Sequence, residues 1–156
     1  MNIGFYSGSF DPFTNGHLHI VKTASSIFDK VIIGIGVNHQ KKRRYDSNLI
    51  REAIEKSLKR ENLKNVEVVT YDMLTVDIAS TYHANFLIRG LRNDTDYAYE
   101  ENLSQINEEI SGLDTIYLRS GTFGFISSSM VSELIEYKKD VSKYVPQDIL
   151  NAINTK

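Results

Sequence analysis

The feature that most restricts the fold of this chain is the alternation of short apolar runs with segments of helical periodicity. The apolar runs occupy residues 2–6, 31–37, 66–70, 85–88 and 115–118, and none shows the polar alternation of a half-solvated strand. Strands of this kind are buried on both faces, and helical segments between them imply βαβ units. The sequence therefore predicts an α/β protein with a doubly wound, mostly parallel sheet of about five strands.

The segments between the apolar runs carry apolar residues at helical spacing. A last short helix is expected to begin at Pro146, because proline is favoured in the first helical turn. A length of 156 residues, with 41% apolar and 24% charged residues, suits a single domain over residues 1–156. We expect the other helices over residues 17–28, 48–59, 75–82, 95–110 and 128–138.

Composition excludes several classes of protein. The formal net charge of −2 provides no long-range field that would attract nucleic acid or an anionic membrane. The absence of cysteine rules out disulfides, Cys-ligated zinc and thiol catalysis. The sequence shows neither a signal peptide nor an apolar stretch of about 18 residues. We therefore expect a cytoplasmic protein with no nucleic-acid or membrane partner.

The loops after the predicted strands should carry the chemistry, because such sheets bind ligands beyond the carboxyl ends of their strands. In the first loop, "SGSFDPFTNGH", Gly8 permits close approach of a ligand, and Thr14 or Asn15 can cap a helix that starts near Gly16. His17 then lies in the first helical turn, where N–H groups and the helix dipole favour anions. Its imidazole could donate a hydrogen bond to a phosphate oxygen, although a simple capping histidine explains His17 alone equally well.

Two motifs in the chain resemble the signatures of the nucleotidyltransferase superfamily. Residues 14–17, "TNGH", match the T/H-x-G-H signature, and residues 126–129, "ISSS", match I-S-S-[ST]. The segments "GVNHQKKRR", "IRGLRNDTDYAYE" and "DVSKYVP" further resemble the phosphopantetheine adenylyltransferase family, in that family's order and spacing. The resemblance covers essentially the whole chain. The serines at 127–129, taken alone, are also explained as a common helix-capping cluster.

The resemblance implies a Rossmann-like nucleotidyltransferase fold and a specific reaction. AMP would pass from Mg²⁺-bound ATP to 4′-phosphopantetheine, giving dephospho-coenzyme A and pyrophosphate in the penultimate step of coenzyme A biosynthesis. Such a transfer needs no protein nucleophile, because the acceptor already carries an anionic oxygen, but it needs cations and N–H donors to hold two polyanions together. No metal site in the protein is expected, since Mg²⁺ on a triphosphate keeps many of its waters. A homohexamer is implied as well.

The resemblance also implies roles for individual residues. His17 would stabilise the transition state, and Lys41 and Arg89 would bind phosphates at the reacting centre. Ser9 would contact both the acceptor and ATP, and Thr75 falls at a pantetheine-contact position. The implied ATP contacts are Ser9, Phe10, His17, Gly90, Leu91, Arg92, Glu100, Phe123, Gly124, Phe125, Ile126, Ser127, Ser128 and Ser129.

The chain departs from the family pattern at several positions. Ser7 replaces the usual proline before Gly8, and Ala98 replaces a common glutamate. Ser132 stands where the wider superfamily often has a basic residue, so one phosphate contact is expected to be missing or supplied elsewhere. In the run "KKRR" at 41–44, we expect one phosphate-binding lysine with solvated neighbours.

Two other functions compete with this interpretation. A sister transferase would adenylylate nicotinamide mononucleotide or cytidylylate glycerol phosphate, but the "IRGLR" block and the Lys41 loop argue against it. A nucleotide-binding sensor without catalysis is the second alternative. The presence of His17, Lys41 and Arg89 together argues against that loss of activity.

Overall fold

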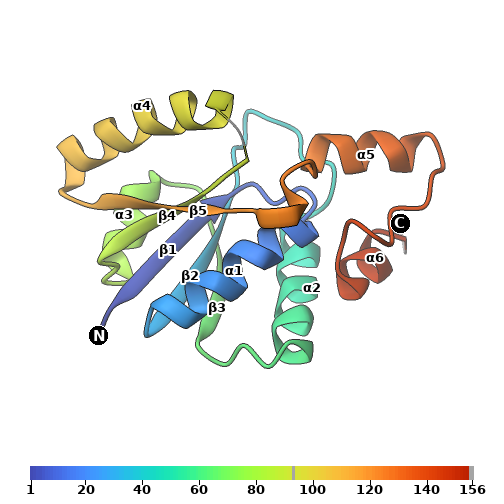
Figure 1. The fold of residues 1–156 in the computed structure, drawn as a ribbon, viewed down its shortest axis with the longest axis horizontal. Helices are drawn as coiled ribbons and strands as arrows, with labels where there is room; N and C mark the ends of the chain where they lie inside the picture. The colour runs from blue at the N-terminus through green and yellow to red at the C-terminus, as the bar shows by residue number, and fades with distance from the viewer. Residues whose placement is uncertain (93, 155–156) are drawn as a thin grey trace.

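The fold is built on one parallel sheet, and the computed structural model describes residues 1–92 and 94–154. The strands lie in the order β3-β2-β1-β4-β5, and every neighbouring pair is parallel (Figure 1). This arrangement confirms the predicted doubly wound parallel sheet. The strand bounds are β1 Ile3–Gly8, β2 Lys30–Gly36, β3 Val66–Tyr71, β4 Phe86–Leu91 and β5 Asp114–Arg119.

Helices cover both faces of the sheet. Helices α1 and α2 pack on one face, and α3 and α4 pack on the other, while α6 lies beside α2 and α5 lies on the same side of the molecule as α6 (Figure 1). The six helices fall where the sequence predicts them, and the last begins directly after Pro146. Their bounds are α1 Asn15–Ile27, α2 Ser47–Arg60, α3 Thr75–Thr81, α4 Asp94–Ser111, α5 Ser128–Glu136 and α6 Gln147–Asn154, with a 3₁₀ turn, η1, at Gly121–Phe123.

Burial on both faces explains the unbroken apolar runs of the sequence. Phe5 and Ile32 belong to the apolar cluster under α3, whereas Tyr6 and Ile33 belong to the cluster under α1 and α2. Successive strand residues point to opposite faces, so each of these neighbours must be apolar. Burying one such side chain contributes about 1.5–3 kcal/mol, which makes the register of the central strands strongly preferred.

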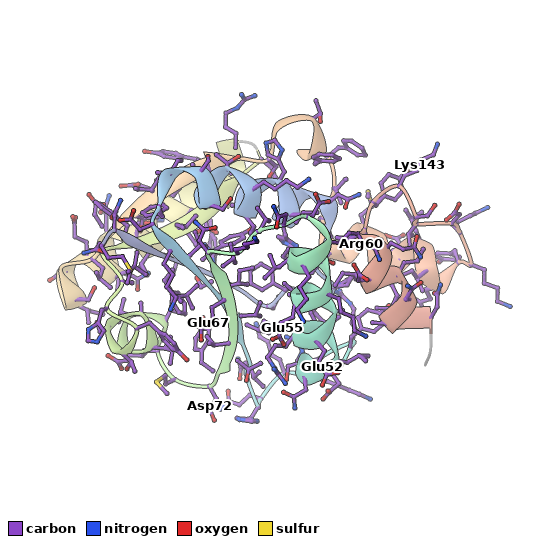
Figure 2. The ribbon with its side chains drawn as sticks, turned by 90° about the horizontal axis from the view of Figure 1, so that it is seen from below. Glu52, Glu55, Arg60, Glu67, Asp72 and Lys143 are labelled. Atoms are coloured by element: carbon purple, nitrogen blue, oxygen red, sulfur yellow. The ribbon has the colours of Figure 1, made fainter. Side chains whose placement is uncertain are left out.

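The C-terminal segment is tied to α1 and α2. The backbone N–H of Asn15, the first residue of α1, donates to the carbonyl of Tyr144 at 2.8 Å. Arg60 donates to both carboxylate oxygens of Asp148 on α6, at 3.0 and 3.1 Å, which lowers the pKa of Asp148. Figure 2 shows Arg60 at the end of α2 that faces α6. The "DVSKYVP" segment thus supports the start of α1, where the first loop ends.

The strand order places a crevice at one edge of the sheet. The order reverses at β1, which lies between β2 and β4, and sheets of this type bind ligands at the carboxyl ends of such strands. Those ends are the region around Gly8 and the region around Arg89. In the part of the chain that is described, no helix is both long and apolar enough to cross a membrane.

Candidate active site

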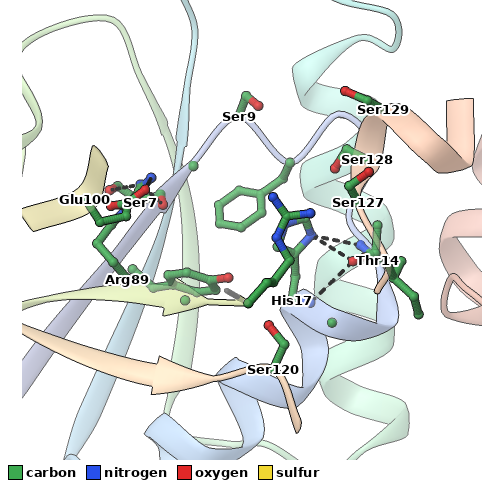
Figure 3. Close-up of a pocket in the computed structure, with 17 residues that line it drawn as sticks. Ser7, Ser9, Thr14, His17, Arg89, Glu100, Ser120, Ser127, Ser128 and Ser129 are labelled. Carbon is green, nitrogen blue, oxygen red and sulfur yellow. Dashed lines mark hydrogen bonds and ion pairs between the residues drawn. The ribbon is translucent and has the colours of Figure 1, made fainter. Parts of the chain in front are cut away.

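A cavity of about 300 Å³ opens at the carboxyl ends of β1 and β4. It collects side chains and backbone from the first loop, the start of α1, the end of β4 and the start of α5 (Figure 3). Its lining residues are Tyr6, Ser7, Gly8, Ser9, Phe10, Thr14, Gly16, His17, Arg89, Gly90, Arg92, Glu100, Ser120, Ile126, Ser127, Ser128 and Ser129.

His17 is held by the cap of its own helix. Thr14 is the N-cap of α1, and its hydroxyl accepts from the His17 backbone N–H at 3.4 Å. In return, His17 Nδ1 accepts from the Thr14 backbone N–H at 2.9 Å, which completes a capping box. Because Nδ1 is an acceptor, the proton of the neutral ring lies on Nε2. His17 therefore caps its helix through Nδ1, the alternative that the sequence left open, and its Nε2–H remains as a hydrogen-bond donor.

The environment of His17 keeps the ring neutral. Burial, followed by the positive charges of Arg92 and Arg89, lowers the pKa of His17 to about 3. The ring packs edge-on against Phe10, with centroids 4.9 Å apart, and lies 5.4 Å from the ring of Phe13. At neutral pH the site therefore contains a neutral N–H donor at a helix start, close to two guanidinium groups.

The turn before α1 depends on Gly8 and Phe10 together. A Cβ on Gly8 would lie only 3.0 Å from the Phe10 ring, so a larger residue would displace that ring. Phe10 has φ 48°, in the left-handed region, and its side chain is buried against His17. We expected Gly8 to leave room for a ligand. The structure adds a second reason for the glycine, because the space beside it holds the ring that supports His17.

Arg89, on β4, is fixed by three of its nitrogens. Nε and Nη2 donate to the two carboxylate oxygens of Glu100 at 2.6 and 2.7 Å. Nη1 donates to the Ser7 carbonyl at 2.7 Å and to the Ser7 hydroxyl at 3.1 Å. Burial opposes the charged form, but the Glu100 interaction outweighs it, and the pKa of Arg89 is raised. Glu100 was expected to contact ATP; it lines the cavity, but its carboxylate is engaged with Arg89.

The three serines at the start of α5 make different contacts. The Ser127 hydroxyl accepts from the Met130 backbone N–H at 3.0 Å and caps the helix. The Ser128 hydroxyl donates to the Pro12 carbonyl at 2.7 Å, which joins α5 to the first loop. Ser129 lines the cavity without a hydrogen bond from its side chain to the described residues. The hydroxyl of Ser132, one turn further on, is buried and also lacks a partner among those residues.

The loop after β2 is fastened to the first loop by arginines. Arg43 donates to the Ser9 carbonyl at 2.8 Å, and its side chain is only 14% exposed. The Arg44 backbone N–H donates to the buried carboxylate of Asp11 at 2.8 Å, and its guanidinium donates to the Asp11 carbonyl at 3.0 Å. The expectation of solvated neighbours for Lys41 was therefore wrong for Arg43, whereas Arg44 is exposed but also holds Asp11. Lys41 itself is exposed and lies outside the cavity lining.

A smaller cavity of about 180 Å³ lies beside the first, between α3, α4 and β4. Thr75 lines this second cavity together with Ser7, Arg89 and Glu100. Because Ser7, Arg89 and Glu100 also line the first cavity, they form the boundary between the two spaces.

The structure brings most of the predicted site residues together, but not all of them. Eleven line the first cavity: Ser9, Phe10, His17, Arg89, Gly90, Arg92, Glu100, Ile126, Ser127, Ser128 and Ser129. Six lie outside its lining: Lys41, Thr75, Leu91, Phe123, Gly124 and Phe125. Ser120 was missed as a site residue although it directly follows β5, the position where we expected functional loops. In the described ranges, 1–92 and 94–154, no three His, Asp or Glu side chains form a group suited to a metal ion.

Several known proteins are similar to this chain in sequence or in fold. Residues 5–134 match the model of the cytidylyltransferase-like family. The chain is 42% identical over 147 residues to the phosphopantetheine adenylyltransferase of Porphyromonas gingivalis strain ATCC 33277, covering 94% of this chain and 95% of that protein. It is 44% identical over 154 residues to the enzyme of the same name from Streptococcus pneumoniae strain Taiwan19F-14, covering 97% and 94%.

A more distant relative in the same set and one solved structure extend the comparison. The phosphopantetheine adenylyltransferase of Shouchella clausii strain KSM-K16 is 39% identical over 153 residues, covering 94% of this chain and 92% of that protein. A structure described as a nicotinate-nucleotide adenylyltransferase from Vibrio parahaemolyticus has a TM-score of 0.70 at 17% identity, covering 99% of this chain and 93% of that one. At that identity the structural match shows the fold alone.

Proposed function

The chain belongs to the phosphopantetheine adenylyltransferase family of cytidylyltransferase-like proteins, and from this premise we propose how its cavities carry out the reaction. The enzyme is a nucleotidyltransferase that moves AMP from ATP to 4′-phosphopantetheine and releases pyrophosphate, with dephospho-coenzyme A as product. The observation that carries the mechanism is the convergence of His17, Arg89 and the start of α5 on one cavity at the carboxyl ends of the strands. Convergence of this kind is what in-line transfer between two polyanions requires.

The two cavities suggest a division of labour between the substrates. We assign the triphosphate to the side where Arg92, His17 and the α5 serines lie, and the pantetheine arm to the second cavity, which Thr75 lines. Arg89 lies at the boundary, so its charge is available to the acceptor phosphate. An oxygen of that phosphate would attack the α-phosphorus of ATP. The bond from the α-phosphorus to the bridging oxygen would break, and pyrophosphate would depart with that oxygen.

The protein's contribution to the transfer is electrostatic. The Nε2–H of His17 donates to an oxygen of the α-phosphate as negative charge develops there. Because the ring is neutral at pH 7, it acts as a hydrogen-bond donor without a change of protonation state. Arg92 and the N-terminal turn of α5 act on the triphosphate side. Mg²⁺ enters with ATP as part of the substrate and neutralises charge on the triphosphate. Lys41 is the proposed second cation for the acceptor phosphate, on the loop that Arg43 fastens to Ser9.

Pyrophosphate release from ATP tests the reaction directly. We expect release with 4′-phosphopantetheine and none with pantetheine, which lacks the attacking phosphate. Nicotinamide mononucleotide, and glycerol phosphate with CTP, should be inactive in the same assay. Turnover with either of these would favour the sister transferases, and absence of turnover with every acceptor would favour a non-catalytic nucleotide sensor.

We further propose that the protein is a homohexamer in the cytoplasm, and an exposed apolar stripe on α4 supports its self-association. Tyr99, Leu103, Ile106 and Ile110 recur at helical spacing and are 64%, 37%, 54% and 62% exposed. Leu103 and Ile110 also line the second cavity, so a second copy would lie along the edge of that cavity. A contiguous apolar stripe of this kind is typical of a surface that another copy covers. Light scattering coupled to gel filtration should give six times the chain mass, and Ile106→Asp should lower it. A monomer in the wild type would contradict the proposal for assembly.

A further inference from the structure

The Ser7 hydroxyl contacts Arg89 at the boundary between the two cavities, and the Tyr71 hydroxyl contacts Thr75, which lines the second cavity. The side chain of Ser7, on β1, is almost fully buried, and its residue lines both cavities. Tyr71, the last residue of β3, is held in place by an edge-on contact with Phe5 at 5.9 Å between ring centroids. Neither residue figured among the predicted site residues. The inference drawn from them rests on the proposed function, since it concerns how Arg89 meets the acceptor phosphate.

The hydrogen bonds of Arg89 leave little choice in how a phosphate can approach it. Of the five N–H groups of a guanidinium, the Nε proton and one Nη2 proton are directed to Glu100. The Nη1 group donates to the carbonyl and the hydroxyl of Ser7. The remaining Nη2 proton is therefore the one with no assigned acceptor among the described residues. The direction of this N–H bond is fixed because Glu100 holds one side of the guanidinium and Ser7 holds the other.

Tyr71 connects Ser7 to the second cavity. The Tyr71 hydroxyl forms a 2.8 Å hydrogen bond with the hydroxyl of Thr75, which lines that cavity. A Cβ on Gly34 would lie 3.0 Å from the Tyr71 ring, and Gly34 pairs with Ser7 in the sheet, so the Tyr71 ring passes over Gly34 toward Ser7. Burial raises the pKa of Tyr71, while the Thr75 hydroxyl, the charge of Arg89 and the Ser7 side chain each lower it. A polar chain thus runs from Thr75 through Tyr71 and Ser7 to Arg89. Its ends lie where the pantetheine arm and the acceptor phosphate are placed by the proposed function.

We propose that Ser7 and Tyr71 are positioning residues that hold the Arg89 guanidinium in the orientation needed for the acceptor phosphate and link that orientation to Thr75. A proline at position 7 could offer the carbonyl of this contact but not its hydroxyl. The hydroxyl matters because it accepts from Arg89 on the side of β1 toward which the Tyr71 ring extends. Neither residue needs to touch the substrate, and the chemistry of the transfer is unchanged. The link makes binding of the pantetheine arm and capture of its phosphate mutually supportive.

The test compares two ligands that differ only in the phosphate. Dissociation constants for 4′-phosphopantetheine and for pantetheine are measured by calorimetry on the full chain and on Ser7→Ala, Tyr71→Phe and the double variant. We expect each single variant to weaken 4′-phosphopantetheine binding by roughly threefold to tenfold, the range for loss of one hydrogen bond. Pantetheine affinity and KM for ATP should change by less than about twofold. In the double variant the loss should be smaller than the product of the two single losses.

Two further variants separate positioning from packing. Ser7→Thr keeps the hydroxyl and should retain affinity for 4′-phosphopantetheine. Ser57→Ala is the matched control, because Ser57 is also a buried serine whose hydroxyl bonds to a charged side chain, in its case by donating to Asp148 at 3.3 Å. Ser57 lies outside both cavities. Ser57→Ala should lower the melting temperature without changing the ratio of the two dissociation constants.

The possible results distinguish this inference from the function on which it rests. A wild type that binds 4′-phosphopantetheine, with variants that lose affinity for both ligands equally or for neither, would overturn the positioning role alone. Losses that multiply in the double variant would overturn the link between Ser7 and Tyr71. A wild type that neither binds 4′-phosphopantetheine nor releases pyrophosphate with it would overturn the proposed function and this inference together.

Discussion

The imidazole of His17 should remain neutral well below the pH at which an ordinary histidine titrates. Burial, Arg92 and Arg89 lower its pKa to about 3, and Nδ1 already accepts from the Thr14 N–H. In the unfolded chain the same ring has a pKa of about 6.5. Between these values the unfolded state binds one proton that the folded state does not bind. Stability from this group is therefore complete above about pH 6.5 and is lost as the pH falls toward 3.

The size of this effect can be worked out from the pKa difference. One proton bound only in the unfolded state changes the free energy of unfolding by at most about 1.4 kcal/mol per pH unit. The unfolded ring is only half protonated at pH 6.5, so we expect an average of about 1 kcal/mol per unit, or about 2 kcal/mol between pH 6.5 and 4.5. His17→Gln provides the reference, because glutamine at this position can keep the capping box with Thr14 and does not titrate.

Urea unfolding of the wild type and of His17→Gln at several pH values between 7.5 and 4.5 measures this difference. The wild type should lose more stability than the variant as the pH falls. In ¹⁵N spectra, the His17 ring should show a protonated Nε2 and an unprotonated Nδ1 throughout. His17→Ala should still bind ATP but lose at least about 100-fold in kcat, as expected for removal of one charge-stabilising donor. Parallel stability curves, or a ring that titrates near pH 6.5, would refute the reasoning.

Five other substitutions have clear expected outcomes. Arg89→Lys cannot reproduce the two-nitrogen contact with the Glu100 carboxylate. In steady-state assays, kcat/KM for 4′-phosphopantetheine should therefore fall at least roughly tenfold. Unchanged kinetics would show that the two-nitrogen contact is dispensable. Ser127→Ala should lower the free energy of unfolding by about 1 kcal/mol and leave ATP affinity intact, because Ser127 caps α5. Ser129→Ala should weaken ATP binding and leave stability intact, because Ser129 lines the cavity. Thermal melts and ATP titrations that give the same pattern for both variants would contradict these separate roles. Lys41→Ala should raise KM for 4′-phosphopantetheine and lower kcat, and no change in either would make Lys41 a solvated side chain. Gly8→Ala places a Cβ 3.0 Å from the Phe10 ring. It should lower the free energy of unfolding by about 1–3 kcal/mol and also lower kcat, because the displaced ring supports His17. A crystal structure of the variant with an unmoved Phe10 ring would contradict this explanation.

The elements of the fold were predictable because their signals are local. Apolar runs without alternation indicated strands buried on both faces, and the Thr14 cap could be expected from residues within one turn of His17. The ends of β1 and β4 were exceptions, and β1 continues two residues past its apolar run, to Gly8. The apolar run stops at Ile88, but the strand continues through Leu91 because β5 pairs with it, Arg89 opposite Tyr117. Pairing with a neighbouring strand extends β4 past the point where its own side chains predict a strand.

The sequence by itself therefore determined the sheet, its helices and the loops that carry the site, through periodicity, capping and motif spacing. Only the tertiary structure decided which groups pair inside that site. Arg89 meets Ser7, which is 82 positions away, and Arg43 meets the carbonyl of Ser9 across 34 positions. Lys41 remains outside the cavity lining despite its place in a matching motif. The physical reason is that such contacts depend on how distant strands and loops pack and on the direction of each side chain, neither of which leaves a periodic trace in the sequence.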